Sequence, residues 1–171
     1  MNRSANASGE ERSDLSNYQR ILVPTDFSPL SVHAAAYARG LAEKHGAEIH
    51  VVHVVVPADV AGTLPLAPGA EPVTALPTVD VLLDTARAGV ANFARDHFSA
   101  SPTKADVLVG AAHAQICQYA LDHAIDLIVI GSHARGVVHR IFLGSVSKAV
   151  LEHSPCPVLM VPLSAVEPQA S

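Results

Sequence analysis

The sequence has little of several features that would define other classes of protein. It has no tryptophan and only 4% aromatic residues, so its core must be built from Val, Leu, Ile and Ala. No apolar run approaches the ~18 residues that a membrane-spanning helix needs. Lysine and arginine total 11 against 16 aspartate and glutamate residues, which gives a net charge of −5. This charge argues against a nucleic-acid-binding protein, which needs a basic face.

Common catalytic and metal-binding patterns are also missing. Cys117 and Cys156 have neither metal nor redox spacing, so we expect two reduced thiols in the cytoplasm. A Walker A loop and a Gly-x-Ser-x-Gly elbow are absent. His50 and His53 are three residues apart on an expected strand and should point to opposite faces. We therefore predict no metal site, and no residue is assigned a catalytic role.

Apolar runs alternate with helical patterns, which predicts an α/β protein. Strands are expected at 20–24, 48–56, 105–110, 126–130 and 157–161, and helices at 29–45, 81–98, 115–124 and 145–153. Near-continuous apolar strands indicate a parallel sheet buried on both faces. Right-handed crossovers then give a single doubly wound, five-stranded parallel sheet of order 3-2-1-4-5 with helices on both faces.

The composition divides the chain into one domain with distinct ends. Residues 1–18 are polar, carry no signal-peptide core and are predicted to form a disordered leader. The domain is expected to span 19–163, and 164–171 form a polar tail. Within the domain, 57–80 holds five prolines and exceeds the usual loop length. We expect an irregular insertion there, either a functional lid or a mobile segment.

The segment from Gly131 to Ser145 joins the fourth strand to the fourth helix and has glycine near both ends. Glycine lets backbone N–H groups approach an anion. Gly144 stands where the helix begins, and helix N-termini bind phosphate through unpaired N–H groups and a partial positive charge. In the predicted strand order, this segment meets the loop Pro24-Thr25-Asp26 at the switch point. The sequence therefore predicts a nucleotide-phosphate site between strands 1 and 4.

The same stretches resemble the universal stress protein family. The matching pieces are 21–28, 53–55, 126–131, 144–147 and 154–158. The nucleotide-binding branch of that family carries Gly-x-x-Gly, nine residues, then Gly-Ser or Gly-Thr. Gly131, Gly144 and Ser145 match this pattern, and Ala134 replaces the second glycine. The resemblance implies an adenine nucleotide alpha hydrolase-like fold.

The resemblance also implies a set of residues around ATP, with or without Mg. These are Pro24, Thr25, Asp26, Val54, Ile130, Gly131, Ser132, His133, Ala134, Arg135, Gly136, Gly144, Ser145 and Val146. It implies that Asp26 lies near the ribose or the phosphates and that the backbone of Val54 meets the adenine. The helix start at Gly144 would hold phosphate oxygens.

Three functions remain open from the sequence. The chain is expected to be an ATP-binding regulatory module in the stress response that acts through protein partners. The alternatives are a weak ATPase or self-phosphorylating protein, with Ser145 or a neighbour as acceptor, and an interaction module without nucleotide. The strand at 158–161 is an apolar sheet edge without charge, and both this edge and the resemblance imply a homodimer joined through it. A cytoplasmic location without nucleic-acid or membrane partners is expected.

Overall fold

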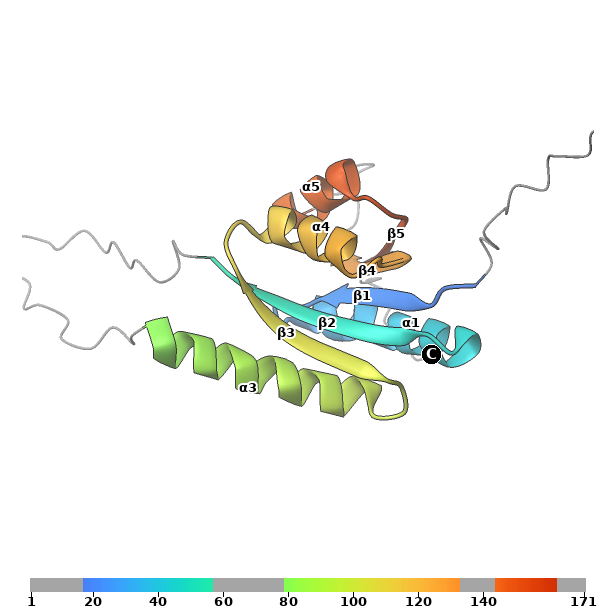
Figure 1. Ribbon diagram of the computed structural model, residues 1–171, viewed down its shortest axis with the longest axis horizontal. Coiled ribbons are helices and arrows are strands. Elements are labelled where there is room, and N and C mark those ends of the chain that lie inside the picture. The colour runs from blue at the N-terminus through green and yellow to red at the C-terminus, as the bar shows by residue number, and fades with distance from the viewer. Residues whose placement is uncertain (1–16, 57–78, 133–143, 163–171) are drawn as a thin grey trace, which may run out of the picture.

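The computed structural model describes residues 17–56, 79–132 and 144–162 of the chain (Figure 1). The strands are β1 (Arg20–Pro24), β2 (Glu48–Val55), β3 (Thr103–Val109), β4 (Leu127–Ser132) and β5 (Val158–Pro162). The helices are α1 (Pro29–His45), α3 (Val79–Phe98), α4 (Ala112–Asp122) and α5 (Ser145–His153).

The strands form one parallel sheet in the order β3-β2-β1-β4-β5, which confirms the predicted fold class. The central strand β1 pairs with its two neighbours over different lengths. β1 pairs with β2 as far as Pro24 and Val52. In contrast, β1 pairs with β4 only at Ile21–Leu127 and Leu22–Ile128. The sheet therefore opens between the carboxyl ends of β1 and β4, which is the switch point of a doubly wound sheet.

Helices cover both faces of the sheet, as the sequence predicted (Figure 1). On one face, α1 and α3 pack around Ile49 and Val51 of β2. On the other face, α4 and α5 pack around Val52. Neighbouring side chains of a strand point to opposite faces, so β2 contributes to both cores. Burying one such aliphatic side chain completely is worth about 1.5–3 kcal/mol.

Helix α1 begins and ends where its sequence indicates. The Ser28 side chain accepts the backbone N–H of Ser31, and Pro29 occupies the first turn, where no donor is needed. Gly46 ends the helix in the left-handed region with φ 67°, and its N–H donates to the Ala42 carbonyl. Both ends are thus set by local sequence.

Two strands are longer than predicted. β3 begins at Thr103 rather than at 105, and its first residues are mostly exposed at the sheet edge. Such an edge strand needs no continuous apolar run, so its start gave no signal. β4 continues to Ser132, which places Gly131 and Ser132 in the strand rather than in the predicted loop.

Two helices also start earlier than predicted. α4 begins at Ala112 rather than at 115, and its N-cap position, Ala111, makes no side-chain capping hydrogen bond. Without a capping residue the sequence carries no start signal. α3 begins at Val79, inside the expected insertion 57–80. The rest of that insertion, and nearly all of the expected leader and tail, lie outside the described residues.

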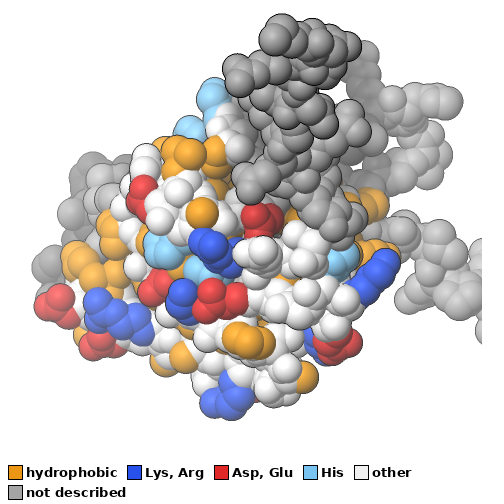
Figure 2. Space-filling model, turned by 45° about the vertical axis from the view of Figure 1, so that its right-hand side comes forward, with side chains coloured by type: hydrophobic (Ala, Val, Ile, Leu, Met, Phe, Trp, Pro, Cys, Tyr) orange, Lys and Arg blue, Asp and Glu red, His pale blue; other side chains and the backbone are white. Residues whose placement is uncertain are grey.

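Within the described ranges, every helix is too short or too polar to cross a bilayer. On the face shown in Figure 2, basic and acidic side chains are interspersed. That face therefore presents no broad basic patch of the kind that binds nucleic acid.

Candidate functional site

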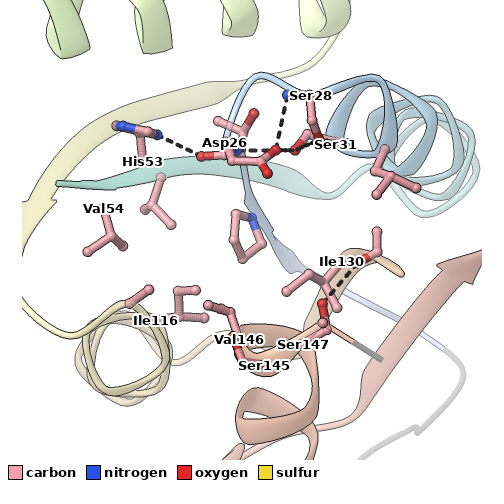
Figure 3. A pocket seen from close by; sticks show the side chains of 17 residues that line it. Asp26, Ser28, Ser31, His53, Val54, Ile116, Ile130, Ser145, Val146 and Ser147 are labelled. Carbon is pink, nitrogen blue, oxygen red and sulfur yellow. Dashed lines mark hydrogen bonds between the residues drawn. The ribbon is translucent and has the colours of Figure 1, made fainter. Parts of the chain in front are cut away.

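A cleft of about 260 Å³ lies at the switch point of the sheet (Figure 3). β1, β2 and β4 contribute their carboxyl ends, and α1, α4 and α5 contribute their N-terminal turns. The lining residues are Pro24, Thr25, Asp26, Ser28, Leu30, Ser31, Val52, His53, Val54, Ala112, Ile116, Ile130, Gly131, Gly144, Ser145, Val146 and Ser147. Segments far apart in the sequence thus meet in one concave site.

The fold brings most of the residues named from the sequence to this cleft. They are Pro24, Thr25, Asp26, Val54, Ile130, Gly131, Gly144, Ser145 and Val146. Ser132 differs, because it is buried in β4 and does not line the cleft. The remaining four, His133, Ala134, Arg135 and Gly136, lie outside the described residues.

The carboxylate of Asp26 stands at one side of the cleft. Its Oδ1 accepts the Ser28 backbone N–H at 3.0 Å and the Ser31 hydroxyl. Partial burial opposes ionisation, but these hydrogen bonds outweigh it and hold the pKa of Asp26 below its ordinary value. Asp26 is therefore a carboxylate at neutral pH, and it can accept a hydroxyl proton or bind a cation.

The N-terminus of α5 forms another side of the cleft, and no side chain of the described residues caps it. Gly144 is the N-cap residue, and the start makes no side-chain capping hydrogen bond. The Ser147 hydroxyl, which lies within the first turn, donates to the Gly131 carbonyl at 3.0 Å. The N–H groups of this turn, with the positive end of the helix dipole, therefore suit an anion.

The structure gives Gly131 a different role from the one the sequence indicated. A Cβ atom at this position would lie 2.8 Å from the backbone oxygen of Leu30 in α1. Gly131 thus lets the first turn of α1 pack directly on β4, whereas the sequence indicated a loop glycine that approaches an anion. Gly144 is the opposite case, because the atom nearest to a Cβ there is the Ser147 hydroxyl at 4.0 Å.

The backbone of Val54 faces the open side of β2. The Val52 carbonyl accepts the Thr25 N–H at 2.8 Å on the β1 side, and the Val55 carbonyl accepts the Gly110 N–H at 3.0 Å on the β3 side. Residues alternate between these sides, so the N–H and C=O of Val54 point toward β1. Pairing with β1 has ended by then, and among the described residues no backbone group of the β1 loop bonds Val54. With respect to the described residues, one backbone donor and one acceptor of Val54 are thus open to the cleft.

The two strand histidines occupy opposite faces of β2, as predicted. His50 is buried and its Nδ1 lies 3.0 Å from the Tyr119 hydroxyl on the α4 side. His53 donates from Nδ1 to the Thr25 carbonyl at 2.8 Å and stacks on Phe27. In the described part of the chain, no group of three His, Cys, Asp or Glu side chains is placed to hold a metal.

Sequence reasoning missed the cleft residues that tertiary packing contributes. They are Ser28, Leu30, Ser31, Val52, His53, Ala112, Ile116 and Ser147. Ser28 ends the matching piece 21–28 but was given no role in the site. Val52 and His53 precede Val54 on the same strand and could have been found from it. No local signal identifies Ile116, because helix α4 brings it over the sheet from a distant part of the chain.

The fold and the cleft define an α/β protein with a ligand cleft at the switch point of its parallel sheet. The profile of the Universal stress protein family matches residues 17–162. The chain is 31% identical over 144 residues to a universal stress protein of Methanocaldococcus jannaschii, which covers 84% of this chain and 82% of that protein. The chain therefore belongs to the universal stress protein family.

Solved structures agree with this assignment. The universal stress protein UspA from Lactobacillus plantarum is 30% identical, with a TM-score of 0.62 over 85% of this chain and 98% of that chain. Another universal stress protein, solved in complex with cAMP, has a TM-score of 0.60 over 87% of this chain and all (100%) of that chain. At 23% identity, this second likeness concerns the fold alone.

Proposed function

We propose that the cleft binds an adenine nucleotide, with ATP as the physiological ligand, and that the protein is a regulatory module of the stress response acting through partners. The N-terminus of α5 carries this proposal, because it places inside the cleft backbone N–H groups that no side chain of the described residues caps. A family relative that binds cAMP supports an adenine ligand.

The cleft offers separate partners for each part of a nucleotide. The open N–H and C=O of Val54 match the acceptor and donor on the edge of adenine, and Ile116 supplies an apolar wall. The Asp26 carboxylate suits a ribose hydroxyl or a Mg²⁺ ion, because it accepts hydrogen bonds and carries negative charge. The first turn of α5, from Ser145, suits the phosphates.

A binding role is favoured over a catalytic one. Among the described residues that line the cleft, Asp26 and His53 have side chains suited to general-base catalysis. Asp26 is held by Ser28 and Ser31, and His53 is bonded to the Thr25 carbonyl. Without a base directed at an attacking water, phosphate transfer should be slow at most.

Titration calorimetry of the purified full chain with ATP, AMP and GTP tests this function. We expect ATP and AMP to bind and GTP to bind more weakly, because guanine has a donor at N1 and an acceptor at O6, the reverse of the pattern that the Val54 N–H and C=O match in adenine. Phosphate release should stay near background. Absence of heat with both adenine nucleotides would refute the nucleotide site, whereas rapid phosphate release would make the protein an ATPase.

We also propose that the protein is a homodimer joined through β5. β5 is an edge strand that pairs with β4 on one side. Val158, Leu159 and Met160 remain partly exposed there. Met160→Lys should place charge in the shared edge and yield monomers. Light scattering measures this directly, and a wild-type mass near 17.8 kDa at micromolar concentration would exclude the dimer.

The proposed location is the cytoplasm. Cys117 and Cys156 are both free thiols in the structure. Free thiols are usual in a reducing compartment, whereas secreted proteins of this size tend to pair them.

A further inference from the structure

Phe27 has an unusual backbone conformation next to the cleft. Its φ is 62°, and Ala124 is the other described non-glycine residue with positive φ. An aromatic residue is disfavoured in this left-handed region, so surrounding contacts must hold it there. Phe27 is also 39% exposed, so burial alone does not account for its position.

The ring of Phe27 is held between β2 and α3. It stacks on His53 with a centroid distance of 4.5 Å and an interplanar angle of 26°. It also meets Phe93 of α3 edge-on at 6.2 Å. Gly89 of α3 lies directly beneath the ring, and a Cβ there would come within 3.1 Å of the Phe27 Cζ atom. Gly89 therefore provides the space that the ring occupies.

The backbone of Phe27 is tied to the cleft-lining loop. Its N–H donates to the Thr25 hydroxyl oxygen at 3.0 Å, and the stacked His53 donates to the Thr25 carbonyl at 2.8 Å. Thr25, Asp26 and His53 line the cleft, whereas Phe27 does not. A shift of the Phe27 ring would thus move the loop that carries the Asp26 carboxylate.

We propose that Phe27 is a positioning residue for ligand binding: seated on Gly89 and stacked on His53, it fixes the Asp26 loop in the conformation that receives the sugar of the nucleotide. This inference rests on the proposed nucleotide site and extends it to α3, which does not touch the cleft. The small size of Gly89 in α3 therefore determines nucleotide affinity, although no residue of α3 lines the cleft.

Two helical glycines provide a matched test. Gly89→Val should displace the Phe27 ring, whereas Gly40→Val in α1 makes the same substitution at a position where a Cβ meets no atom within 4 Å. Both substitutions change helix propensity by the same amount, so a difference in ATP affinity between the two variants measures the effect of displacing the Phe27 ring. We expect Gly89→Val to weaken ATP binding about fivefold, because releasing a strained residue changes a free energy of order 1 kcal/mol. Gly40→Val should bind as the wild type does.

A double-mutant cycle separates positioning from general damage. Phe27→Ala should weaken ATP binding to a similar extent, and adding Gly89→Val to it should cause no further loss, because the ring is already gone. Calorimetry below the unfolding temperature of every variant gives the affinities. Wild-type affinity in Gly89→Val, or additive losses in the double variant, would overturn the role of Phe27. Failure of the wild type to bind ATP would instead refute the proposed function.

Discussion

Helices α1 and α5 both begin at the cleft, but their first turns are completed differently. At α1, Ser28 caps the Ser31 N–H, Pro29 removes a donor, and Asp26 adds a carboxylate to the turn. At α5, the N-cap residue is Gly144, which has no side chain to offer. The same sheet edge therefore presents one helix start with a side-chain cap and one that no side chain of the described residues caps.

This difference shows how a fold can separate a structural helix start from a binding one. A capped N-terminus has little remaining affinity for an anion, because its donors and its dipole already face oxygen atoms. An uncapped one keeps both available. The residue types decide the outcome: Ser-Pro with a nearby aspartate fixes α1, whereas the glycine at the N-cap of α5 has no side chain with which to cap it.

The largest expected effect concerns the contact between the first turn of α1 and β4. Gly131→Ala would force a Cβ to within 2.8 Å of the Leu30 carbonyl oxygen, and this overpacking should cost about 1–3 kcal/mol of stability. Urea unfolding measures the loss. Gly40→Ala is the control, where no atom lies within 4 Å, and it should stabilise by about 0.5–1 kcal/mol. Equal stability of the two variants would show that α1 does not depend on this contact.

The next effect tests whether the open α5 start serves a ligand. Gly144 has φ −57°, which any residue adopts, and among the described residues the atom nearest to a Cβ there is the Ser147 hydroxyl at 4.0 Å. Gly144→Val should therefore fold, but its side chain should block phosphate and weaken ATP binding about tenfold or more. Calorimetry with ATP checks this, alongside a melting curve of the variant. Undiminished affinity would mean that phosphate binds elsewhere.

Serine substitutions at the two helix starts should differ in stability. Ser28→Ala removes the cap of α1 and should cost about 1 kcal/mol. Ser145→Ala removes an exposed hydroxyl with no capping role and should change stability by less than about 0.5 kcal/mol. Urea unfolding without nucleotide compares them. A similar loss in both variants would remove the distinction between a capped and an open start.

The smallest effect is a pH dependence at α1. Hydrogen bonds hold the pKa of folded Asp26 below its ordinary value, so its contribution to stability is complete above about pH 4. It is lost as the pH falls through the lower, folded-state pKa. At about pH 5 to 8, which is above the ordinary pKa of aspartate, the wild type should be more stable than Asp26→Asn by a constant amount. This difference in stability should disappear in acid. A gap that persists at low pH would show that charge is not its source.

The sequence predicted the fold more completely than the site. The strand at 20–24 and the helix at 29–45 were predicted from local sequence with the bounds that the structure shows, and the alternation of strands and helices gave the strand order. Gly131 shows where local signals end. A glycine is needed at this position because the Leu30 backbone of α1 packs directly against β4 there. No pattern in a single sequence shows which backbone segment will lie against a given glycine.

The missed cleft residues have the same cause. Ile116 reaches the cleft because α4 crosses the sheet, and the start of α4 lacks a capping residue that would have located it. Phe27 was visible in the sequence, but its left-handed φ was not. Side chains that act through packing against distant elements are found only when the elements are assembled.

The short pairing between β1 and β4 has a mechanical consequence. Two registered positions join a three-strand block, β3-β2-β1, to a two-strand block, β4-β5. Helix α1 bridges this seam on one face through its contacts with β1, β4 and β5, and α4 bridges it on the other through β2 and α5. A nucleotide held between Val54 and the α5 start would be a third bridge across the same seam. Ligand binding would then resist the separation of two halves of the molecule, so its stabilising effect would be felt throughout the sheet.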